Sequence, residues 1–236
     1  MADEIEDDPT KIDWARKDRF RKDFQRRAGL AFLLMCFGIG VLAFITPIVL
    51  PLVGGYDGHY SISFFYNVDS TRDIFVALLC ATGVFLVLFQ GLSRWENLLL
   101  SLAGIFLILV AMVPTSEVQC GGDEVFTWHA AFAVSFFACL FVVAIFFSKN
   151  RLDYILWPPL RRKFARAYNI AGFGMIGLPL LAYGVHLVGG RDCSHVIYWI
   201  EAGAIFSFAF YWFTKTMEYK QLLGLKFKEI VARAMD

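Results

Sequence analysis

The chain has 236 residues, of which 58% are hydrophobic and only 18% are charged, and its formal net charge is +1 at pH 7. An apolar composition with so few charges excludes an ordinary soluble domain and a disordered chain, and it favours an integral membrane protein. The charges also gather in short stretches between long apolar blocks, which is the arrangement of a polytopic protein.

The first segment, residues 1–28, is a polar tail that is acidic at its start and basic afterwards. Residues 13–27 predict a helix at the membrane surface, with Trp14, Phe20 and Phe24 dipping into the headgroups. We expect this tail to be separate from the membrane-spanning part that follows.

Six apolar blocks are each long enough to cross about 30 Å of hydrocarbon, which takes roughly 20 helical residues. They cover residues 29–50, 73–92, 97–114, 127–147, 169–188 and 195–214. The sequence therefore predicts an all-α bundle of six transmembrane helices over residues 29–214. Pro47, Pro51, Pro114 and Pro179 lie in or at the ends of these blocks, where they would kink or terminate helices.

The basic residues are distributed very unevenly between the two sides of this bundle. If both tails, residues 92–97 and residues 148–168 lie in the cytoplasm, they hold 20 of the 22 Lys and Arg, and only Arg72 and Arg191 face outward. The positive-inside rule then predicts cytoplasmic termini, in a bacterial inner (plasma) membrane. The basic clusters orient the chain and favour anionic lipid as a neighbour, and they do not indicate nucleic-acid binding.

The five cysteines fall into two groups. Cys36, Cys80 and Cys139 lie inside predicted spans and behave as small apolar residues. Cys120 and Cys193 lie in two outward loops, where an oxidising compartment favours a disulfide. With two candidates there is one possible pairing, so the sequence predicts a Cys120–Cys193 disulfide.

Polar residues that lie within or beside the spans are candidates for function, because ionisable groups are costly in a membrane. They gather on the outward side, under the aromatic stretch "SISFFY". On the cytoplasmic side we find only Gln90 and Lys215, and we expect Lys215 to snorkel to the surface. The candidates for an outward-facing polar pocket are Glu201, His129, Asp73, Arg72, Ser61, Ser63, His59, His186 and Trp212.

Small residues and a polar stripe mark the last two spans. Gly177 and Gly184 are seven residues apart, which predicts close helix packing. Glu201, Ile205, Phe208, Trp212 and Lys215 advance by four, three, four and three residues, so they share one helix face. A glutamate facing lipid would be costly, so this face should point into the bundle. Residues 215–236 then predict a cytoplasmic amphipathic helix.

Three interpretations of the outward polar residues remain open. In the first they are structural, with Glu201 paired to Arg72, His129 or His186 and with Asp73 capping its helix. In the second they bind a metal such as zinc, although no H-x-x-x-H or H-E-x-x-H motif is present. In the third, aromatic and polar side chains form a pocket for a lipid headgroup or small amphiphile.

Two other functions find little support. A serine nucleophile is not favoured, because no G-x-S-x-G motif is present and the proximity of Ser61 and Ser63 to His59 in a loop is commonplace. Proton-coupled transport is not favoured either, because the ionisable groups are expected on one side of the membrane only.

Four motifs together resemble a family of small bacterial six-span membrane proteins known only as a domain of unknown function. They are "SISFFY" with "RDIFVALLCATGVFLVLFQG", "AGIFLILVAMVPT", "WHAAFAVSFF" and "IEAGAIFSFAFYWFTK". The resemblance covers most of residues 58–216 and implies no established activity.

A more distant resemblance is to the ceramidase and receptor group of membrane hydrolases, which place Ser, Asp and His residues around a metal. Ser63, Asp73 and His129 match those residue types. That group has seven spans and a paired H-x-x-x-H in the last one, whereas here six are predicted and the last carries Glu201 without a histidine pair. The resemblance therefore does not carry a metal over to this chain.

The sequence thus predicts an integral membrane protein that binds a lipid or small amphiphile in an outward-facing polar pocket, or acts as a subunit of a membrane assembly, including a homo-oligomer. The alternative is a metal-dependent membrane hydrolase of a lipid amide or ester, with zinc as the candidate metal.

Overall fold

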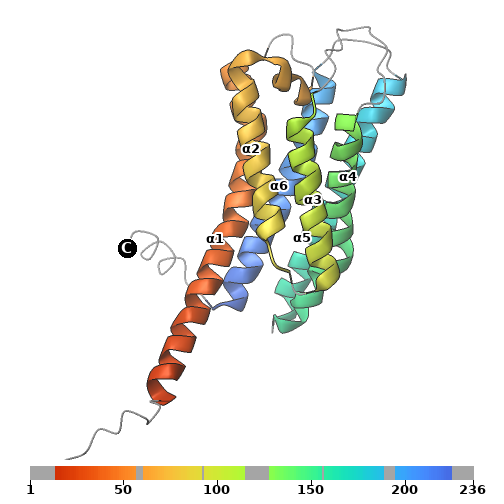
Figure 1. Cartoon of the computed structure of the whole chain (residues 1–236). Helices are drawn as coiled ribbons and strands as arrows, with labels where there is room; N and C mark the ends of the chain where they lie inside the picture. The colour runs from red at the N-terminus through yellow and green to blue at the C-terminus, as the bar shows by residue number, and fades with distance from the viewer. Residues whose placement is uncertain are drawn as a thin grey trace, which may run out of the picture.

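The computed structural model describes residues 14–56, 61–91, 93–114, 128–155, 157–188 and 195–224. Within these ranges the chain is helical and contains no strand, which confirms the predicted all-α class (Figure 1). The elements are α1 (Trp14–Gly54), η1 (Ser63–Asn67), α2 (Asp69–Leu88), α3 (Arg94–Met112), α4 (Trp128–Val142), η2 (Val143–Phe147), η3 (Ser148–Tyr154), α5 (Pro158–Val188) and α6 (Val196–Leu222).

Five stretches of the described chain are long and apolar enough to cross a membrane. They are Arg16–Gly54, Asp69–Leu88, Arg94–Met112, Trp128–Tyr154 and Val196–Leu222. Helices of this length and apolarity are those of an integral membrane protein, because a spanning segment must satisfy its backbone hydrogen bonds internally.

Helix α1 is a single helix of 41 residues that runs without a break through the predicted surface helix and the first span. Its first turns extend beyond the other helices (Figure 1). The expected boundary near residue 28 is therefore not a break in the helix. Gly29 is the one residue there that could cap a helix end, but no proline follows it until Pro47 and the apolar run continues, so the helix passes through.

Helix α1 also continues through Pro47 and Pro51, which the sequence suggested as points of kinking or termination. A proline at position 51 has no N–H to donate to the carbonyl of Pro47, four residues earlier. The hydroxyl of the buried Tyr198, on α6, donates to that carbonyl instead. A partner helix thus satisfies the backbone group that the proline leaves without its usual donor.

The helices pack as neighbours in chain order, and α6 also packs along α1 (Figure 1). Helices α2 and α3 approach closely at Gly83 and Gly104, where a Cβ added to Gly104 would lie 2.5 Å from the carbonyl oxygen of Gly83. The predicted close contacts at Gly177 and Gly184 are wrong for the part of the chain that the structure describes, because a Cβ there would meet none of its atoms within 4 Å.

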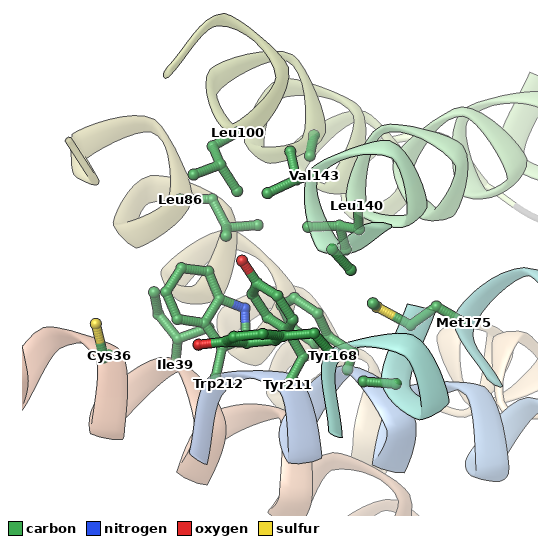
Figure 2. Packing of buried hydrophobic residues seen from close by; sticks show 14 of the residues in the cluster. Cys36, Ile39, Leu86, Leu100, Leu140, Val143, Tyr168, Met175, Tyr211 and Trp212 are labelled. Atoms are coloured by element: carbon green, nitrogen blue, oxygen red, sulfur yellow. The ribbon is translucent and has the colours of Figure 1, made fainter. Parts of the chain in front are cut away.

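Two clusters of buried side chains fill the bundle. The larger one surrounds Tyr168, Tyr211 and Trp212, whose rings gather between the helices in Figure 2. The smaller one contains Phe65 and Tyr198, and it lies where η1 meets the start of α6. Each cluster borders one group of polar side chains.

Candidate functional site

The aromatic stretch after α1 packs into the protein rather than forming a solvated loop. Phe65 is completely buried and Tyr66 nearly so, and both belong to the smaller buried cluster. The hydroxyl of Thr71, in the first turn of α2, donates to the carbonyl of Phe65 at 2.8 Å. Burial of the two rings and this hydrogen bond fix η1 against α2.

Glu201 ties this stretch to the first turns of α6. The hydroxyl of Ser61 donates to both carboxylate oxygens, at 2.9 and 3.1 Å, and the backbone N–H of Ile62 donates to one of them at 2.7 Å. Hydrogen bonds to a carboxylate are stronger than those between neutral groups. Glu201 is half-buried, so its carboxylate is held in place without being sealed from its surroundings.

A second pair of side chains continues these hydrogen bonds toward α4. The backbone N–H of Ser63 donates to the hydroxyl oxygen of Ser61 at 3.2 Å, and the Ser63 hydroxyl lies 3.2 Å from Nε2 of His129. On the other side of the ring, Nδ1 of His129 lies 3.0 Å from the carbonyl oxygen of Val113. A carbonyl only accepts, so Nδ1 carries the hydrogen and Nε2 accepts from Ser63.

We call the group formed by Ser61, Ile62, Ser63, His129 and Glu201 the Glu201 cluster. Its members come from η1 and the residues before it, from α4 and from α6. The sequence had named four of the five as pocket candidates, and the structure brings these four together.

Aromatic rings gather at the start of α6, in the turn before Glu201. The Tyr56 ring stacks on His195 with centroids 4.1 Å apart, and it meets the ring of Tyr198 edge-on at 5.6 Å. Trp199, which is 61% exposed, lies 6.4 Å from Tyr56. Tyr198 and Trp199 precede Glu201 by three and two residues on α6, so this aromatic group lies within one helical turn of Glu201.

Other candidates from the sequence lie apart from this group. Arg72 and Asp73 are exposed on α2. The guanidinium of Arg72 donates to the hydroxyl of Tyr66 at 3.3 Å and lies 5.0 Å from its ring centre, in place of the predicted pairing with Glu201. The expected capping role of Asp73 is wrong, because α2 begins four residues earlier and Asp69 occupies its first turn.

Trp212 is also separate from the Glu201 cluster, since it lies eleven residues further along α6. It is fully buried and meets the ring of Phe89 edge-on at 4.9 Å. The predicted inward stripe on α6 is nevertheless confirmed at its far end, where Phe208, Trp212 and Lys215 are all buried.

Several predictions fall on residues outside the described part of the chain. His59, Cys120 and Cys193 lie there, and His186 lies in α5 without a described side chain. The Cys120–Cys193 disulfide therefore stays a prediction.

The structure corrects the expectation that the other half of the bundle lacks buried ionisable groups. Lys215 does not snorkel to the surface, because it is 0% exposed, and its Nζ lies 3.4 Å from Oε1 of Glu96, which is 2% exposed. Glu218 is also 0% exposed and accepts a hydrogen bond from the hydroxyl of Tyr168. We call Glu96, Tyr168, Lys215 and Glu218 the Lys215 cluster.

Aromatic rings enclose this cluster. The Lys215 ammonium lies 5.5 Å from the ring centre of Tyr168 and 5.7 Å from that of Tyr211, distances at which cation–π attraction acts. The hydroxyl of Tyr211 lies 2.8 Å from that of Ser148, which in turn donates to the carbonyl of Val143. The hydrogen bond from Ser148 to Val143 therefore links η3 to η2.

The sequence contains signals for the Lys215 cluster. Lys215 and Glu218 are three residues apart and share a helix face. Helix α6 runs on to Leu222, two turns past the predicted end of the span, so both residues lie within the bundle. Glu96 lies three residues after Ser93, and its backbone N–H donates to the Ser93 hydroxyl oxygen at 3.0 Å. This pair has the pattern of an ordinary helix cap, which gives no sign that Glu96 is buried.

Among the residues that the structure describes, no three His, Cys, Asp or Glu side chains are grouped so as to hold a metal ion. Comparisons with protein-family models, with curated proteins and with solved structures found no match to this chain. The site is therefore interpreted from its own geometry.

Proposed function

We propose that the chain is a six-span integral membrane protein of a bacterial inner membrane, with both termini in the cytoplasm. In this arrangement the Glu201 cluster faces outward and binds the polar headgroup of a lipid or small amphiphile. The distribution of Lys and Arg, 20 of 22 on one side, supports the orientation. The 31 residues of α5, which packs against α4 and α6, support the sixth span.

The observation that carries the binding site is the half-buried carboxylate of Glu201, held by Ser61 and Ile62, within one helical turn of the aromatic group of Tyr56, Tyr198 and Trp199. Ligand pockets typically combine aromatic walls with a few fixed polar groups. A carboxylate with aromatic faces nearby suits a headgroup that donates hydrogen bonds or carries positive charge. The acyl chain of the same ligand would lie along the apolar helices, where lipid already surrounds the protein.

The binding site can be tested on protein extracted from its membrane in mild detergent. Native mass spectrometry counts the lipid molecules that stay bound to the wild type and to Glu201→Gln, which keeps an oxygen to accept from Ser61 and Ile62 but removes the charge. We expect bound lipid on the wild type and a loss of most of it in the variant.

The matched control is Asp153→Asn, an acidic residue whose side chain is 82% exposed and paired with Arg161. This control should retain the lipid of the wild type. A wild type without bound lipid, or equal occupancy in Glu201→Gln and the wild type, would contradict the proposal.

The orientation has its own test. Reporter fusions after residue 224 should show a cytoplasmic location, and fusions in residues 115–125 should show the outside of the membrane. A cytoplasmic signal from residues 115–125 would reverse the placement of the Glu201 cluster.

A further inference from the structure

The contact between Ser63 and His129 is the feature of the Glu201 cluster that headgroup binding does not use. We propose that Ser63 is a nucleophile with His129 as its general base, and that the pair hydrolyses an acyl ester in the bound amphiphile. This reaction rests on the proposed function, because the same site would hold the substrate.

The two side chains have the geometry of a nucleophile and its base. The Ser63 hydroxyl and Nε2 of His129 lie 3.2 Å apart, at the end of the usual range for such a pair, although 66 residues separate them in the chain. The Val113 carbonyl accepts from Nδ1–H and so fixes the tautomer in which Nε2 is free of hydrogen. This carbonyl takes the place of the acidic third member of a catalytic triad.

The environment of the pair also suits the roles assigned to it. Ser63 is part-exposed at the first residue of η1, whereas His129 is only 4% exposed and lies behind it. The backbone N–H of Ser63 is bonded to Ser61, which is itself bonded to Glu201. A nucleophile within reach of a ligand, with its backbone fixed and its base shielded, is placed for attack.

The reaction balances with water as the only co-reactant. The Ser63 oxygen bonds to the ester carbonyl carbon while its proton passes to Nε2 of His129. The carbon–oxygen bond to the alcohol breaks, and the alkoxide takes that proton and leaves as the alcohol. A water molecule then attacks the acyl-serine, gives its proton to Nε2, and releases the carboxylic acid as the proton returns to Ser63.

A fluorophosphonate with an alkyl chain tests the nucleophile directly on the purified full chain. The probe forms a phosphorus–oxygen bond to a serine activated by a base and expels fluoride. Peptide mapping should place the label on Ser63, and Ser63→Ala should abolish it. His129→Gln should slow labelling by about 100-fold or more, which is the typical contribution of a general base.

A matched control is Ser135→Ala, which removes a serine whose hydroxyl donates to the Ala131 carbonyl of its own helix at 2.8 Å. This variant should be labelled as quickly as the wild type. If His129→Gln does not fold, Ser63→Cys provides the same test. Its thiol should be alkylated faster than that of Ser61→Cys, since only position 63 contacts the histidine.

Failure of the reaction can be told apart from failure of binding. A wild type that carries lipid but takes no label at Ser63, or takes it at the same rate in His129→Gln, would overturn the reaction and leave the binding site standing. Loss of both the lipid and the label in the wild type would overturn the proposed function as well.

Discussion

Helix α6 holds two polar clusters that are built on different principles. Glu201 and Lys215 are fourteen residues apart, about 21 Å at 1.5 Å per residue. Glu201 is half-buried and receives its hydrogen bonds from a hydroxyl and a backbone N–H. Lys215 is sealed, and its charge is balanced by a buried carboxylate and by two aromatic rings.

The difference indicates which cluster can take part in function. A fixed carboxylate that keeps part of its surface open can meet a ligand, whereas charges that satisfy one another inside the bundle cannot do so without breaking their contacts. A buried ion pair adds little net stability, but removing one partner is strongly destabilising. We therefore expect substitutions in the Lys215 cluster to affect folding and those in the Glu201 cluster to affect binding.

The largest expected effect is that of Lys215→Met. It leaves the buried carboxylate of Glu96 without its cation, in a cluster where one oxygen of the buried Glu218 already has no hydrogen-bond partner among the described residues. We expect a loss of about 3–5 kcal/mol in the free energy of unfolding, measured by denaturant titration in detergent.

The control for this prediction is Lys163→Met, an exposed lysine on α5, which should change stability little. The double variant Lys215→Met with Glu96→Gln should recover part of the loss, since it also removes the carboxylate that Lys215→Met leaves unpaired. If Lys215→Met lowered the free energy of unfolding no more than the control, the pairing of Lys215 with Glu96 would not be needed for stability.

The next effect concerns the predicted Cys120–Cys193 disulfide. If Cys120 and Cys193 are joined, Cys120→Ser should lower stability by about 2–4 kcal/mol. Peptide mapping without reductant should find the two cysteines linked, and reductant should abolish the difference between variant and wild type. Alkylation of both thiols in unreduced protein would show that the link is absent.

A smaller effect is expected for Tyr198→Phe, which keeps the ring but removes the hydroxyl that donates to Pro47. A buried carbonyl left without its donor costs about 1–3 kcal/mol. The loss should appear as a lower thermal midpoint, with Tyr154→Phe, at an exposed tyrosine, as the control. An unchanged midpoint would mean that another donor serves the Pro47 carbonyl.

The sequence predicted the helices well because apolar blocks of this length have few other solutions in a membrane. It also grouped Glu201, His129, Ser61 and Ser63, because all four occupy one level of the predicted bundle. The sequence could not predict which of these side chains contact one another, because the contact of Ser63 with His129 depends on how η1 folds against the helices. The Lys215 cluster was missed because a lysine at the end of a span is usually read as a snorkelling residue.

The comparison of the two clusters can be tested in one measurement, on Glu201→Gln and Lys215→Met prepared side by side in the same detergent. Bound lipid per protein and thermal midpoint are recorded for each. We expect Glu201→Gln to lose its lipid while its midpoint, read in delipidated samples, shifts by less than about 4 °C. Lys215→Met should keep its lipid in the folded fraction, and its thermal midpoint should fall by more than about 6 °C. The opposite pattern, a large midpoint loss with retained lipid in Glu201→Gln, would contradict a binding role for the Glu201 cluster and make Glu201 a structural residue.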